Sequence, residues 1–188
     1  MITLNDRQIN YIRMGKDYLK NSDLHSFFVR LYMNNTDASA LAQYMLENNV
    51  PIWEYLETVF PLFSHYQFSN TDLSLPSNIK RIASNAFACS NLTSVTMTDS
   101  VQTIEQSAFQ SCSGLQSIRL SNQLTVIPAY CFDGCDSLQE IFIPDSVQLI
   151  ERNAFYNTNA IVKISKNRST KIELEKNNDM VLANLQII

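Results

Sequence analysis

The chain has 188 residues, of which 45% are hydrophobic and 17% charged, and its formal net charge is −4. The sequence has no basic cluster of the kind that binds a phosphate backbone and no run of roughly 20 apolar residues, so we expect neither a nucleic-acid nor a membrane partner. The N-terminus also lacks the apolar core of a signal peptide, which favours a cytoplasmic location.

Residues 1–67 show the spacing of amphipathic helices. Helices are expected over about 5–20, from Ser22 or Asp23, from Thr36 and from Pro51. The last of these would carry Val59 on its apolar face and end near Pro61. We interpret 1–67 as a helical capping domain for the chain that follows, because the end of a solenoid must be covered. A second docking surface in this segment, including one for self-association, is the alternative.

Residues 68–188 contain an internal repeat of 22 or 23 residues, with four clear copies at 75–97, 98–120, 121–143 and 144–166. Four apolar columns recur: Ile82, Ile104, Ile127 and Ile150; Phe87, Phe109, Phe132 and Phe155; Leu92, Leu115, Leu138 and Ile161; and Val95, Ile118, Ile141 and Ile164. Weaker matches before and after these copies extend the pattern to about six short parallel strands. The prediction is an α+β fold, a leucine-rich-repeat solenoid with an N-terminal helical cap.

Each repeat unit is expected to place alternate side chains of a short strand inward and to return through a tight turn or short helix that holds the Ile and the Ala-Phe pair. A single unit cannot bury its apolar face, so stacked units would share one core with the Phe column as its spine. The alternative, that the Phe column is a ligand-binding stripe, is less favoured because repeat cores require periodic apolar columns.

The pattern IxxIxxxAFxxCxxLxxI resembles the BspA-like, or Treponema pallidum-type, leucine-rich repeats. The first copy lacks one residue between Phe87 and Cys89, and the fourth has Thr158 where the pattern has Cys. The resemblance implies a repeat-based binding protein, and many members of the family are secreted or surface-displayed adhesins. Short forms with a helical lead-in are also loosely similar to leucine-rich-repeat proteins encoded by bacteriophages.

No constellation of residues predicts chemistry. Cys89, Cys112 and Cys135 fall in one column, and Cys131 stands where the other copies have Ala, so all four cysteines are expected to be small fillers and free thiols. Zinc would need four converging ligands, and the Cys131–Cys135 pair has no nearby His. We therefore expect no metal, no cofactor and no catalytic residue, and hence no enzyme.

The surface expected to bind a partner is the concave, solvent-facing side of the strands, where side chains alternate with the buried ones. Most are small and polar, but Phe142 and its neighbour Arg119 depart from that pattern, and exposed aromatic and Arg side chains are typical of binding hot spots. The predicted partner-binding residues are Arg119, Glu140, Phe142, Lys163, Ser117 and Thr96. A cation–π contact between Arg119 and Phe142 is the alternative use of these two side chains.

The favoured function is a non-enzymatic module that binds another protein, of phage origin and acting on a host protein if the looser resemblance holds. A surface adhesin for a matrix protein or glycan is the second interpretation, and a structural or virion component is the third.

Overall fold

The computed structural model describes residues 58–59, 63–68, 70–167, 171–175, 181 and 183–188. The predicted helical capping domain over 1–67 lies mostly outside the described residues. Where the two overlap, the expected helix is wrong, because Val59 lies in a β-strand. The compact unit that holds the repeats runs from Thr58 to Ile188.

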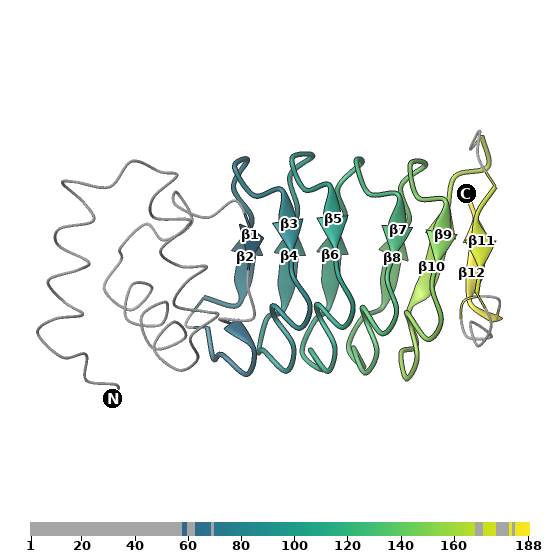
Figure 1. Ribbon diagram of the computed structural model, residues 1–188. Coiled ribbons are helices and arrows are strands. Elements are labelled where there is room, and N and C mark those ends of the chain that lie inside the picture. Colours follow the sequence, from purple (N-terminus) through teal and green to yellow (C-terminus); the bar gives the residue numbers. More distant parts are fainter. Residues whose placement is uncertain (1–57, 60–62, 69, 168–170, 176–180, 182) are drawn as a thin grey trace, which may run out of the picture. The chain divides into compact units, whose positions relative to one another are not determined.

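The described elements are short parallel strands that form a β-solenoid, in which each turn adds one strand to a front row and one to a back row (Figure 1). The front row consists of β2 (Asp72–Ser74), β4 (Ser94–Thr96), β6 (Ser117–Arg119), β8 (Glu140–Phe142), β10 (Ile161–Ile164) and β12 (Leu185–Ile187). The back row consists of β1 (Thr58–Val59), β3 (Arg81–Ile82), β5 (Thr103–Ile104), β7 (Val126–Ile127), β9 (Leu149–Ile150) and β11 (Glu173–Leu174). The predicted solenoid is therefore confirmed, but the Ile column lies in the back-row strands and not in a turn or helix.

The core is a continuous stack of rings, as the repeat predicts. Neighbouring rings lie 5.2–5.8 Å apart between centroids and within 22° of parallel. The stack consists of Phe63, Phe87, Phe109, Phe132 and Phe155. Each of these side chains is at most 2% exposed, so the column is the spine of the core. Phe63 adds one more member than the four clear copies indicated.

In each of the four clear copies, two residues hold the left-handed backbone conformation that bends the chain from the back row towards the front row. One column is Asn85, Ser107, Tyr130 and Asn153, and the other is His65, Cys89, Ser111, Gly134 and Asn157. All but Gly134 carry a Cβ, and such conformations cost roughly 1–2 kcal/mol per residue. They are stabilised by hydrogen bonds between turns, such as those from the N–H groups of Phe87, Phe109 and Phe132 to carbonyls of the next turn at 2.8–3.0 Å.

The hydrogen-bonded strand pairing of both rows is interrupted between the second and third repeats. The front row forms the ladders β2-β4-β6 and β8-β10-β12, and the back row forms β1-β3-β5 and β7-β9-β11. In the back row, Pro128 lies directly after β7 and has no N–H to donate. Its counterparts Glu105, Glu151 and Glu175 donate to the previous turn at 2.9–3.0 Å. Nothing in β6 or β8 explains the matching interruption of the front row.

The same three glutamates also join turns through their side chains. Their carboxylates accept hydrogen bonds from the N–H groups of Ser84, Ala129 and Arg152 in the previous turn, at 2.8–3.0 Å. The carboxyl group of Glu105 also pairs with Arg81. Burial raises the pKa of Glu105, but the hydrogen bonds from Arg81 and Ser84 lower it by more, so the net shift of this pKa is downward. Pro128 lacks this carboxylate as well as the N–H.

Candidate partner-binding face

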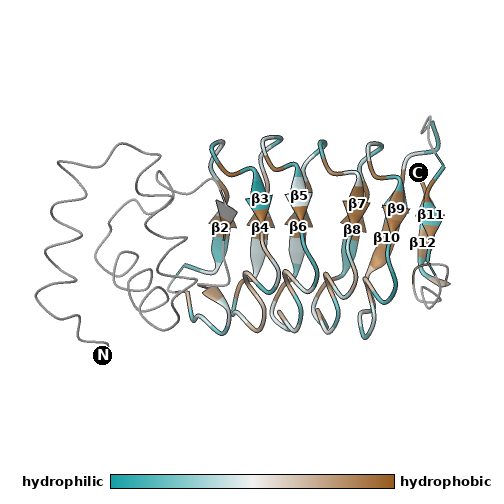
Figure 2. Cartoon of the chain, in the orientation of Figure 1, coloured by the Kyte–Doolittle hydropathy of each residue, from teal (hydrophilic) through white to brown (hydrophobic). Residues whose placement is uncertain are grey.

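The outward side chains of the front-row strands form one continuous surface, which we call the front face. In β2, β4, β6 and β8 the central residue is buried and its neighbours are more exposed, as the predicted alternation requires. One line of equivalent outward positions holds Asp72, Ser94, Ser117, Glu140 and Ile161, and the other holds Ser74, Thr96, Arg119, Phe142, Lys163 and Gln186. Strands of the first two repeats are polar to neutral, whereas β7 to β10 are more hydrophobic (Figure 2).

All six residues predicted to bind a partner lie on the front face. Thr96, Ser117, Arg119, Glu140 and Phe142 are exposed, and Lys163 is half-buried. Phe142 is 46% exposed, although an aromatic residue is normally largely buried. Lys163 is its register partner on β10.

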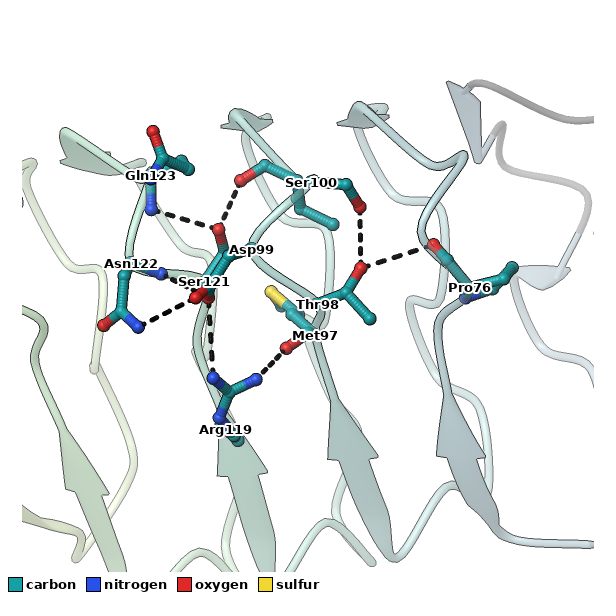
Figure 3. A network of polar contacts seen from close by, with 10 residues as sticks. Pro76, Met97, Thr98, Asp99, Ser100, Arg119, Ser121, Asn122 and Gln123 are labelled. Carbon is teal, nitrogen blue, oxygen red and sulfur yellow. Dashed lines mark hydrogen bonds and ion pairs between the residues drawn. The ribbon is translucent and has the colours of Figure 1, made fainter.

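Arg119 is held by the preceding turn. Its Nη1 donates to the carbonyl oxygen of Met97 at 2.6 Å, and its Nη2 lies 3.5 Å from Oδ1 of Asp99 (Figure 3). Asp99 also accepts hydrogen bonds from the backbone and side chain of Asn122 at 3.0 and 3.1 Å. These Asn122 bonds, followed by the charge of Arg119, lower the pKa of Asp99 despite partial desolvation. The Arg119 guanidinium is thus fixed in place by backbone and carboxylate contacts, while its side chain stays 53% exposed.

Glu140 and Lys163 form an ion pair across β8 and β10. Their side chains are 61% and 25% exposed, so each charge balances the other at the surface beside Phe142. Exposed pairs of this kind add little to stability, typically about 0–1 kcal/mol. Their effect here is to leave the surroundings of the Phe142 ring close to neutral.

The last turn differs from the predicted columns. Val162, and not Ile164, pairs with Ile141 and is 1% exposed, and Ala160 is buried where the prediction placed Ile161. Ile161 instead faces outward opposite Glu140 and is half-buried. Sequence reasoning missed this apolar residue of the front face because the run Ile161–Ile164 fits a strand in either of two registers. The signal that could have revealed it is the smaller number of residues between Phe155 and the buried Val162 than between Phe132 and Ile141.

The cysteine column also needs one correction. Ser90, and not Cys89, occupies the buried position of Cys112, and their side chains lie 3.5 Å apart. Cys89 holds the left-handed position instead, because the residue missing from the first copy comes after Ser90 and not before Cys89. The thiols of Cys112 and Cys135 donate to the carbonyl oxygens of Phe87 and Phe109 at 3.0 and 3.2 Å.

The other cysteine predictions stand. All four thiols are free, and Cys131 is fully buried in the column of Ala86, Ala108 and Ala154. Burial raises the pKa of Cys112, Cys131 and Cys135, so these thiols stay protonated at neutral pH. Within the described ranges, His, Cys, Asp and Glu side chains form no group of three or more that could hold a metal ion. The same part of the chain contains no helix with the length and hydropathy needed to span a bilayer.

A family model matches most of the part of the chain that forms the solenoid. Residues 58–177 match a family model described as the BspA type leucine rich repeat region, in six copies. The chain is similar to the crystal structure of a leucine rich cell surface protein from Faecalibacterium prausnitzii, with 28% identity and a TM-score of 0.48 over 63% of this chain and 36% of that one. A leucine-rich repeat protein from Bacteroides capillosus is 30% identical, with a TM-score of 0.45 over 57% of this chain and 79% of that one.

A leucine-rich repeat protein from Bacteroides ovatus is 17% identical, with a TM-score of 0.46 over 66% of this chain and 44% of that one. The chain thus spans little more than a third of the length of the F. prausnitzii protein and less than half of the B. ovatus protein. No curated protein matches the chain. Repeats of this type generally mediate protein binding or surface interactions, and the proteins that contain them are typically non-enzymatic.

Proposed function

The chain belongs to the BspA-type leucine-rich-repeat family, and from that premise we propose that it binds another protein through the front face, centred on Phe142. The observation that carries the proposal is the 46% exposure of Phe142. Equivalent positions on the neighbouring strands hold Thr96, Arg119 and Lys163, so stacking of the repeats does not require an aromatic side chain there. A large exposed ring in a polar row is typical of the centre of a binding hot spot.

The surroundings of Phe142 support a contact with a protein surface. Ile161 adds apolar area one strand away, and the Glu140–Lys163 pair supplies a polar rim with balanced charge. Arg119 is already ordered by Met97 and Asp99, so its binding costs less side-chain entropy than that of a free arginine. Apolar centre, ordered Arg and polar rim together are the usual anatomy of a protein–protein interface.

The test is affinity capture from a native lysate with three forms of the protein: the wild type, the double variant Arg119→Ala, Phe142→Ala, and the control Tyr156→Ala. Tyr156 is also an exposed aromatic residue, but it lies in a turn and not on the front face. We expect the double variant to bind the partner more than about 30-fold more weakly than the wild type, because each of two hot-spot truncations costs roughly 1 kcal/mol or more of binding free energy. Equal capture by the wild type and the double variant would show that the front face is not the binding surface.

The cytoplasm is the location we propose for this activity. Four free thiols, three of them buried, suit a reducing compartment, where disulfides are rare. If the gene is carried by a phage, the partner would be a host protein. Cell fractionation and surface labelling of intact cells test the location. A chain found outside the cell would favour an adhesin for a matrix protein or glycan, and one found in purified virions would favour a structural component.

A further inference from the structure

A second surface of the solenoid, separate from the front face, contains an open groove of about 700 Å³. It crosses the turns that join β5 to β6, β7 to β8 and β9 to β10. The groove lies within the roughly 300–1,000 Å³ range of sites for small ligands. Its lining includes Ser111, Ser113, Asp136, Tyr156, Asn157 and Asn159.

The repeat sequence explains why the groove begins at the second clear copy, residues 98–120. In the first clear copy, Asn91 follows the buried Ser90. The side-chain amide of Asn91 accepts a hydrogen bond from the N–H of Phe68 at 2.6 Å and donates one to the carbonyl oxygen of Phe68 at 2.9 Å. In the later copies, Ser113, Asp136 and Asn159 follow the buried Cys112, Cys135 and Thr158, and the second and third copies have one more residue before the next buried Leu. Gly134 has no side chain to narrow the groove, and a Cβ at this position would lie 3.5 Å from the Cα of Ser111.

The polar side chains of this lining are free to bond to a ligand. Polar side chains on the neighbouring turns join one turn to the next, as in the pairs Gln110–Asp133 at 2.8 Å and Asn153–Tyr130 at 3.1 Å. Within the described part of the protein, the six lining side chains make no hydrogen bond to other residues. The lining residues therefore offer hydroxyl, amide and carboxylate groups, with both donors and acceptors available.

One aromatic ring completes the site. Tyr156 is 51% exposed and belongs to the lining of the groove, so its ring is available for an apolar contact. The only charged side chain in the lining is Asp136, and no Lys or Arg contributes, so the groove is unsuited to phosphate or to an acidic ligand. A ligand that fits must combine an apolar ring face with several neutral hydroxyl groups.

We propose that this groove binds a neutral oligosaccharide, with one sugar ring packed on Tyr156. The sugar hydroxyls donate to the carboxylate of Asp136 and exchange hydrogen bonds with the side chains of Asn157 and Asn159. Ser111 and Ser113 extend the polar strip along the second turn, so that a chain of several sugar rings lies across the repeats. The site is distinct from the front face, and failure of this proposal leaves the protein-binding proposal intact.

The experiment is a binding screen of the full chain on an array of neutral oligosaccharides that includes maltotriose, chitotriose and mannotriose, followed by titration calorimetry with the best binder. We expect Tyr156→Ala to weaken binding about tenfold, the loss typical for an aromatic contact, and Asp136→Ala to weaken it at least as much. Tyr156→Phe keeps the ring and should retain affinity within about threefold.

Two controls make the outcome decisive. Phe142→Ala removes the exposed aromatic residue of the front face and should leave sugar affinity unchanged. The melting temperature of each variant shows whether the fold survives, and half-exposed Tyr156 should tolerate substitution. Absence of binding across the neutral array would overturn the proposal. Equal affinity of the wild type and Tyr156→Ala, or a groove that binds only peptides, would overturn it too.

Discussion

Replacing Pro128 with Glu should repair the interrupted back-row ladder and stabilise the solenoid. At the equivalent position, Glu105 and Glu151 each donate a backbone hydrogen bond to the previous turn at 2.9 Å. Their carboxylates accept a second bond from a backbone N–H of that turn, at 2.9 and 2.8 Å. Pro128→Glu supplies a backbone N–H that can donate to the carbonyl oxygen of Ile104. It also supplies a carboxylate that can accept from the backbone N–H of Gln106.

The expected gain follows from three terms. The new backbone bond contributes about 1 kcal/mol, and the carboxylate bond, which is partly exposed, contributes about 1 kcal/mol. The unfolded chain regains freedom when proline is lost, which costs about 0.4–1 kcal/mol. The net expectation is a free energy of unfolding about 1 kcal/mol higher than that of the wild type.

Urea unfolding of the wild type, Pro128→Glu and Pro128→Ala measures this difference. Pro128→Ala adds the N–H without the carboxylate, so its stability should be close to that of the wild type. Hydrogen exchange provides a second readout, because the amide of Gln106 should be protected more strongly in Pro128→Glu than in Pro128→Ala. If Pro128→Glu is no more stable than Pro128→Ala and the Gln106 amide exchanges equally fast in both, the carboxylate does not join the turns at this position. If neither variant is more stable than the wild type, the missing N–H does not cause the interruption either.

Three further predictions concern the core and the thiols. Phe109→Ala should lower the free energy of unfolding by about 3–5 kcal/mol, because Phe109 is fully buried between two stacked rings, whereas Phe142→Ala should change it by less than about 0.5 kcal/mol in the same urea titrations. The free energy of unfolding should fall as the pH rises above 9.0, the ordinary thiol pKa, because the thiols ionise in the unfolded chain before they ionise in the folded one. The slope should be up to about 1.4 kcal/mol per pH unit for each buried thiol. Cys131→Ala, which places there the alanine that the other copies have, should make this loss of stability shallower. In the native protein a thiol reagent should label Cys89, which is half-buried, well before the buried Cys112, Cys131 and Cys135, and equal labelling rates would contradict the described burial.

The stacked core could be read from the sequence because the repeat places each core residue at a fixed interval. The Phe column and the Ala position that holds Cys131 are found as predicted. The back-row strands could not be predicted, because a two-residue strand such as Arg81–Ile82 has too few residues to show an alternating pattern. Its single buried Ile is equally compatible with a turn or a short helix.

Register within a copy was harder to predict than the repeat itself. A single missing residue near Cys89 can be placed on either side of that cysteine in an alignment, and only the hydrogen bonds between turns decide that Ser90 fills the buried position. The last turn posed the same problem, because Ile161 and Val162 are both apolar and only one can face inward. In each case the ambiguity comes from side chains of similar size and polarity at adjacent positions.

The exposed positions of the front face followed from the alternation, but their contacts did not. Arg119 bonds to Met97 and Asp99, which belong to the preceding turn and its loop. No local pattern in the sequence links these residues, since the contact depends on how two turns stack. The cation–π alternative for Arg119 and Phe142 was therefore as reasonable from the sequence as the contact that is found.

Departures from the repeat are more informative about function than the repeat itself. A side chain that recurs in every turn is accounted for by stacking, whereas Phe142 and Tyr156 each place a large exposed ring in a column that otherwise holds no large exposed ring. The column of Tyr156 holds Gln110 and Asp133, which bond to each other, so that position normally joins turns. An aromatic ring there adds nothing to the core and exposes apolar area that a ligand can cover. Because Phe142 and Tyr156 lie on different faces, we expect them to contact two separate ligands.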